Sequence, residues 1–128
     1  MGGTDAARRR RAAERRGRRS ETLAALVLLA KGYCILGRRV RTRAGEIDLI
    51  ARSPGGVICF VEVKARALAQ QAGEALGARQ QGRIARAAAL YLAQRPGLAA
   101  KGARFDTVLL APGSWPKHIR DAWRPSAG

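Results

Sequence analysis

The segment that decides the fold reads Gly45-Glu46-Ile47-Asp48-Leu49-Ile50-Ala51-Arg52, then Ser53-Pro54-Gly55-Gly56, then Val57-Ile58-Cys59-Phe60-Val61-Glu62-Val63-Lys64. Its two apolar runs are rich in β-branched residues, and the stretch between them is typical of a turn. The pattern therefore predicts a hairpin of two antiparallel strands, over 45–52 and from 57 to about 67. Three charges lie inside these runs. Because an unpaired buried charge is costly, something has to compensate Asp48, Glu62 and Lys64.

Strand alternation predicts which of these charges meet. In the second run, Glu62 and Lys64 share one face, and the residues at 57, 59, 61 and 63 share the other. In the first run, we expect Glu46 and Asp48 on one face, opposite Ile47, Leu49 and Ala51. Pairing of the two strands would then let Asp48 approach Glu62.

Two neighbouring carboxylates repel each other, and a divalent cation between them removes this cost. Mg²⁺ in proteins prefers one or two carboxylates, several waters and phosphate oxygens. An ion held by Asp48 and Glu62 would bind a phosphodiester and lower the pKa of a bound water. Lys64 would then position that water or neutralise the transition state. The alternative interpretation is an ion pair of Lys64 with Glu62 or Asp48 on a half-wet sheet face.

The net charge of +16 over 128 residues predicts a polyanionic partner. Arginine supplies most of this charge, and its guanidinium group binds phosphate in a bidentate way. The alternative is the codon usage of a GC-rich genome. One histidine and two cysteines cannot assemble a zinc site of the usual His/Cys type.

The remaining segments predict an α/β fold, with helices on both faces of a mixed central sheet. We expect a basic, disordered arm over 1–19, one domain over 20–124 and a tail over 125–128. The arm would be a solvated tail or an auxiliary nucleic-acid contact. Further strands are predicted over 33–43 and 104–111, and helices over 78–95 and 115–123.

The first helix should begin with Ser20 as its N-cap and end near Lys31. It is apolar nearly all round, so we expect it to be buried, and periodicity leaves open the direction of Glu21. Its apolar stretch is too short to span a bilayer or to serve as a convincing signal peptide. These features predict a cytoplasmic protein with no membrane partner.

Several motifs together resemble a known family. They are Glu21 in the first helix, Gly32-Tyr33-x-Ile35-Leu36, Arg41-x-Arg43-x-Gly45-Glu46-Ile47-Asp48-Leu49-Ile50, Phe60-Val61-Glu62-Val63-Lys64-x-Arg66 and Arg104-Phe105-Asp106. This set resembles the YraN-type family of uncharacterised bacterial proteins from about Arg18 to Trp123. That family in turn resembles PD-(D/E)xK nucleases, especially archaeal Holliday-junction resolvases.

The resemblance implies a restriction-endonuclease-like core. It implies Asp48 and Glu62 as metal ligands, Lys64 as the catalytic lysine and Glu21 as the acid that completes the site. The function expected is a Mg²⁺- or Mn²⁺-dependent endonuclease that hydrolyses DNA phosphodiesters, with branched DNA as a candidate substrate. A homodimer follows by analogy alone. The family often has Lys where this chain has Gln80.

The nucleic-acid contacts that we expect are Arg41, Arg43, Arg66, Gln80 and Arg83, with DNA favoured over RNA. The alternative function is a non-catalytic nucleic-acid-binding module on a nuclease-like scaffold. Four further residues are weaker site candidates. Glu46 is more typical of a solvated strand end, Asp106 of a buried ion pair and His118 of a packing residue, while Glu74 lies in a segment that would cover the site.

Overall fold

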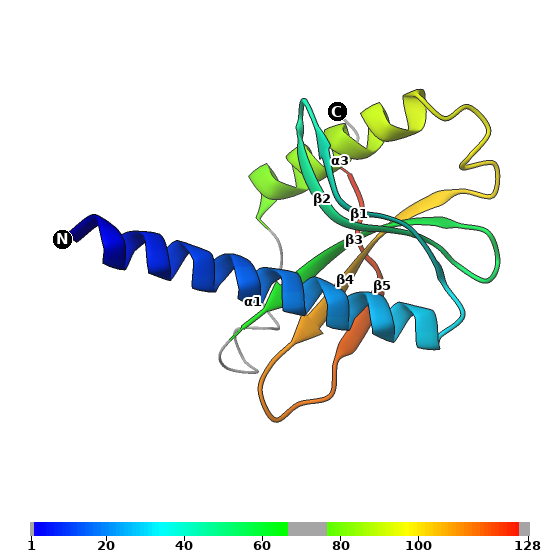
Figure 1. The fold of residues 1–128 in the computed structure, drawn as a ribbon. Coiled ribbons are helices and arrows are strands. Elements are labelled where there is room, and N and C mark those ends of the chain that lie inside the picture. Colours follow the sequence, from blue (N-terminus) through cyan, green and yellow to red (C-terminus); the bar gives the residue numbers. More distant parts are fainter. Residues whose placement is uncertain (1, 67–76, 126–128) are drawn as a thin grey trace.

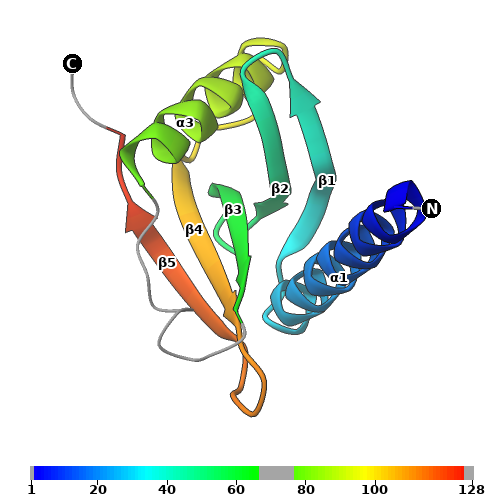
Figure 2. The ribbon, with the colours of Figure 1, turned by 90° about the vertical axis from the view of Figure 1, so that its left-hand side faces the viewer.

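The computed structural model describes residues 2–66 and 77–125, and places one mixed sheet between two helices (Figure 1, Figure 2). The elements are α1 (Gly2–Ala30), β1 (Cys34–Thr42), β2 (Gly45–Arg52), β3 (Ile58–Ala65), α3 (Ala78–Ala93), β4 (Ala103–Leu110) and β5 (Lys117–Trp123). The predicted α/β class, with its mixed sheet and flanking helices, is confirmed. The predicted site candidate Glu74 lies outside the described residues.

The sheet has the order β1-β2-β3-β4-β5. Of the neighbouring strands in the described ranges, only β3 and β4 run parallel, and α3 lies in the connection between them. The predicted hairpin is confirmed, with Leu49 opposite Val61 and Arg52 opposite Ile58. Ser53 closes its turn, because its amide donates to the Val57 carbonyl at 2.8 Å and its hydroxyl accepts from the Val57 amide at 3.0 Å.

Each face of the sheet carries its own core. The core on the α1 side consists of Ala24, Ala25, Leu28, Tyr33, Leu49, Ala51, Cys59, Val61, Val108 and Leu110. The core on the α3 side consists of Ile47, Ile50, Ile58, Phe60, Ala87, Ala88 and Tyr91. The stripe of α3 that faces the sheet was predicted from its helical spacing, and its residues are buried.

Helix α1 differs from its prediction in two ways. It begins at Gly2 rather than at Ser20, since the alanines and arginines before Ser20 favour a helix. It is also buried on one side only: Leu23, Leu26 and Leu29 are exposed, because the sheet meets just the opposite side of the helix (Figure 2). Glu21 lies on the buried side. The division into an arm and a domain stays a prediction.

The segment over 115–123 was predicted to be a short helix, and this prediction is wrong. Residues Lys117–Trp123 form β5, which pairs antiparallel with β4. The open edge of β4 explains the difference, because its backbone groups need partners that a helix would not supply. Trp123 stacks on Phe105 with ring centroids 4.2 Å apart, which fixes the end of the strand. No helix among the described residues is long and apolar enough to cross a membrane.

Asp106 forms the buried ion pair that was predicted. It links β4 to β5 and, through His118, to Lys31 at the end of α1. Its carboxylate is fully buried and accepts hydrogen bonds from Arg104 Nε at 2.9 Å and from the Asp121 amide at 3.1 Å. His118 Nε2 lies 2.8 Å away, and Lys31 Nζ lies 2.6 Å from His118 Nδ1. Since the Lys31 ammonium donates to Nδ1, the ring proton of His118 sits on Nε2 and points at Asp106.

Burial alone would raise the pKa of Asp106, but hydrogen bonds from His118, Arg104 and the Asp121 amide outweigh it and lower the pKa. We expect Asp106→Asn to lower the free energy of unfolding by about 3–5 kcal/mol, because it leaves the half-buried Arg104 guanidinium without its carboxylate partner. Denaturant titration at neutral pH measures this loss. Asp121→Asn, which removes only an exposed ion pair with Arg124, should barely move the midpoint.

The difference in stability between the wild-type protein and Asp106→Asn should depend on pH. A carboxyl with a lowered folded pKa stabilises the protein fully above its ordinary pKa of 3.8, and this contribution is lost as the pH falls below that value. The wild-type protein and Asp106→Asn should therefore converge in acid. Equal midpoints at neutral pH would contradict the structural role of Asp106.

Candidate functional site

The candidate site lies at a fork where β2 separates from β3. The ladder between these strands ends at the pair Leu49–Val61. One residue further, Asp48 Oδ2 accepts a hydrogen bond from the Val63 amide at 2.8 Å. The side chain of Asp48 thus takes the place of a backbone carbonyl, and its carboxylate is fixed between the strands.

The fork also breaks the alternation expected for β2. Ile47 packs with Ile50 in the α3 core, whereas Leu49 and Ala51 pack in the α1 core, so the predicted common face for residues 47, 49 and 51 is wrong. The cause lies in the neighbouring strand. Arg39 has a positive φ of 48°, between the pairs Arg38–Leu49 and Val40–Ile47, so the backbone of β1 departs from extended geometry opposite Asp48.

Strand β3 keeps its alternation, because its parallel register with β4 is regular throughout. Glu62 and Lys64 therefore share the face opposite Val61 and Val63, as predicted. Lys64 is 4% exposed and its Nζ atom is buried. Gln80 of α3 donates from Nε2 to Glu62 Oε1 at 3.1 Å, so the glutamine in the place of the expected lysine contacts the site directly.

Asp48 and Glu62 perturb each other strongly. Burial, with a further contribution from the negative charge of Asp48, raises the pKa of Glu62 to about 8. Burial also raises the pKa of Asp48, although the bond from Val63 opposes this. Among the described residues, no hydrogen-bond partner reaches the buried Glu62 Oε2 atom. Such an atom is typical of a position where an ion or a water belongs.

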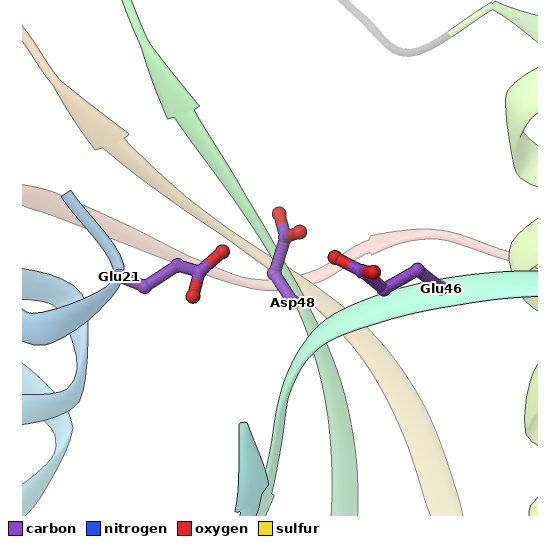
Figure 3. Close-up of side chains that lie close together, drawn as sticks. All are labelled: Glu21, Glu46 and Asp48. Atoms are coloured by element: carbon purple, nitrogen blue, oxygen red, sulfur yellow. The ribbon is translucent and has the colours of Figure 1, made fainter. Parts of the chain in front are cut away.

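Two more acids, Glu21 and Glu46, approach Asp48 from opposite sides (Figure 3). One carboxylate oxygen each from Glu21, Glu46 and Asp48 lies within 4.8 Å of the others. Glu21 comes from α1 and is 6% exposed, which settles the direction that periodicity had left open. Glu46 forms an exposed ion pair with Arg41 at 3.4 Å, as expected of a solvated strand end, and it also reaches this cluster.

Arg39 is the site residue that the sequence did not predict. Its Nε atom donates to both oxygens of Glu21, at 2.8 and 2.7 Å. The acids Glu46 and Asp48 also attract its charge. In the sequence, Arg39 is simply the second of two arginines that follow Gly37 in a predicted strand. This pattern does not indicate that its side chain points toward the site.

Glu21, Asp48 and Glu62 line an open cleft of about 940 Å³ at the carboxyl ends of β3 and β4, and Glu46 does not line it. In open α/β sheets, ligands bind outside the carboxyl ends of parallel strands. Among the residues that line the cleft are Glu21, Asp48, Glu62, Arg19 and Arg66. The cleft therefore brings an acidic centre and two arginines together.

The predicted nucleic-acid contacts fall into two places. Arg66 lines the cleft, and Gln80 contacts Glu62. Arg41, Arg43 and Arg83 are exposed near the turn between β1 and β2. A Cβ atom added at Gly45 in this turn would lie 3.9 Å from Arg83 Cβ, which places α3 beside the turn. These three arginines lie at the end of β2 that is away from the Ser53 turn, and none of them lines the cleft.

Comparison with known proteins confirms the resemblance to the YraN-type family. The sequence model described as Uncharacterised protein family UPF0102 matches residues 20–110. A UPF0102 protein of Maricaulis maris is 52% identical over 92% of both chains. One of Parvibaculum lavamentivorans is 53% identical over 89% of this chain and 85% of its own. One of Paramagnetospirillum magneticum is 51% identical over 97% and 98%.

The raised pKa of Glu62 predicts a pH-dependent loss of stability. Below pH 4.5 the carboxyl is protonated in both the folded and the unfolded protein; between 4.5 and about 8, folding must take up a proton. The wild-type protein should therefore lose stability relative to Glu62→Gln as the pH rises through this window. At the upper end, we expect the variant to be more stable by at least about 1.4 kcal/mol, the value of one pKa unit.

Urea titrations in metal-free buffer at a series of pH values measure this difference. The exposed Glu14→Gln substitution controls for the change in net charge. A gap between wild-type protein and Glu62→Gln that stays constant from pH 4.5 to 8 would contradict the raised pKa.

Proposed function

This chain belongs to the uncharacterised protein family UPF0102, and we propose that it is a metal-dependent nuclease that hydrolyses phosphodiesters of DNA, branched DNA included. The observation that carries the proposal is the convergence of Asp48 and Glu62 at the fork, with Lys64 on the same strand face as Glu62. The net charge of +16 supports a polyanionic substrate.

The acids fit a divalent cation such as Mg²⁺ or Mn²⁺. Carboxylate oxygens are the ligands that these hard cations prefer, and opposite ligands of one Mg²⁺ lie about 4 Å apart. One carboxylate oxygen each of Glu21, Glu46 and Asp48 lies within 4.8 Å of the others, slightly more than this distance, and Glu62 is not part of that group. The buried Glu62 Oε2 offers one more oxygen beside Asp48. We therefore propose Asp48 and Glu62 as ligands, with Glu21 completing the site.

The side chains have separate tasks in this proposal. A bound cation supplies an acidified water and charge neutralisation at the phosphodiester. Asp48 and Glu62 bind it as carboxylates, so Glu62 has to lose the proton that burial stabilises. Lys64 stabilises the negative charge that develops on the phosphoryl oxygens. Arg39 holds Glu21 in the cleft, while Arg66 binds a flanking phosphate.

A non-catalytic nucleic-acid-binding module remains the second candidate function. The exposed arginines outside the cleft favour it, because Arg41, Arg43 and Arg83 would bind phosphates without any metal. Binding of this kind weakens steeply with salt and does not require a cation. Homodimerisation stays a proposal under either function.

A cleavage panel separates the two functions. Purified protein should cut DNA in Mn²⁺ or Mg²⁺ and not in EDTA, over linear, branched and single-stranded substrates. Asp48→Ala and Lys64→Ala should each lower the cleavage rate by about 100-fold or more, since one loses a ligand and the other a positive charge at the phosphate. Asp121→Asn, an exposed acid in an ion pair with Arg124, is the matched control and should cut like the wild-type protein.

Thermal unfolding with Mn²⁺ gives a second readout. A ligand that binds the folded state raises the midpoint by mass action. The wild-type protein and Lys64→Ala should both be stabilised by Mn²⁺, and Asp48→Ala should not. Cleavage that persists in Asp48→Ala would sink the proposed function, and salt-sensitive binding without cleavage would favour the binding module.

A further inference from the structure

Trp115 is a large apolar side chain that faces solvent. It is 93% exposed, in the turn between β4 and β5. The other tryptophan of the chain, Trp123, instead stacks on Phe105. Tryptophan is highly buried on average, so an exposed one is typical of a site that binds another molecule.

This turn borders the cleft of the proposed nuclease. Ser114 and Pro116, which flank Trp115, both line the cleft that also contains Asp48 and Glu62. The Ser114 amide donates to the Ala111 carbonyl at 3.2 Å, which holds the turn. The turn extends beyond the ends of the strands (Figure 2). An aromatic ring thus stands at the rim of a cleft that has acids inside it and arginines along it.

We propose that Trp115 stacks on an unpaired base, and that the substrate class of this cleft is DNA with a single-stranded segment. The inference rests on the proposed function. In a duplex the faces of the bases are covered by their neighbours, so only an unstacked base offers a face to an aromatic ring. Arg19 and Arg66 line the same cleft and would bind the phosphates of that strand.

Charge favours a nucleic acid over a second copy of the chain at this position. Two chains of net charge +16 repel each other, and arginines line the cleft beside Trp115. A single-stranded nucleic acid instead offers both groups that the rim requires: an apolar base face for the ring and phosphates for the guanidinium groups.

Binding in EDTA tests this inference without any cleavage. The affinities of wild-type protein, Trp115→Ala and Trp115→Phe are measured by anisotropy for a single-stranded oligonucleotide, the matched duplex and an abasic strand of equal length. We expect Trp115→Ala to weaken single-strand binding by about 5- to 150-fold, the range that corresponds to the stacking of one base. Trp115→Phe should retain most of the affinity, and the abasic strand and the duplex should not distinguish the three proteins.

A salt series and a fluorescence measurement sharpen the result. Arg66→Ala is the matched control: it should lower the salt slope by about 0.7, because it removes one contact to a phosphate, whereas Trp115→Ala should leave the slope unchanged. Single-stranded DNA should quench the tryptophan fluorescence of wild-type protein and not that of Trp115→Ala, which retains Trp123.

Three outcomes would overturn the inference. They are unchanged single-strand affinity in Trp115→Ala, an equal loss of affinity for the abasic strand, and a loss of self-association in sedimentation with DNA binding intact. The last outcome would identify the turn as a protein contact. Because these measurements contain no metal, failure of stacking leaves the proposed cleavage untouched, and failure of cleavage leaves the stacking result readable.

Discussion

The hydrogen bond from the Val63 amide to Asp48 is the constraint on which the site depends. A strand that leaves its neighbour exposes backbone groups that need partners, and a buried unpaired amide is costly. The Asp48 carboxylate removes that cost at the point of separation. It thereby lets β2 turn Ile47 toward the α3 core, and it opens the space into which Glu62 and Glu21 project. The acid that shapes the fork is also the acid at the centre of the cleft.

The cleft concentrates negative charge in a strongly positive chain. Part of this charge is compensated within the chain: Arg39 pairs with Glu21, and Gln80 donates one hydrogen bond to Glu62. The remaining cost appears in the raised pKa of Glu62, which keeps its proton near neutral pH. A phosphodiester would be repelled by these acids in their ionised form. A divalent cation of the kind proposed above would remove both problems, since it would bind the carboxylates and present positive charge to the phosphate.

The sequence correctly predicted the features that depend on residues close together along the chain. The turn at Ser53 and the alternation along β3 were sufficient to define the hairpin and to place Glu62 beside Lys64. Tertiary effects decided the rest. The pairing need of the β4 edge made a strand of the segment predicted as a helix. The inward direction of Arg39 depends on a left-handed backbone and on an acid from another element, and neither is visible in sequence spacing.

Within two turns, helix α1 carries both an arginine that lines the cleft and an acid of the site. Glu21 points into the cleft, and Arg19 lines it two residues earlier. Gly17 lies about one turn before Glu21, where an added Cβ would come within 3.1 Å of Arg39 Nη2. A larger residue there would require the guanidinium that holds Glu21 to shift by a few tenths of an ångström. The arginine-rich segment before these positions belongs to the same helix and extends beyond the sheet (Figure 1). A polyanion bound along that segment would therefore be led to the acids rather than held at random on the surface.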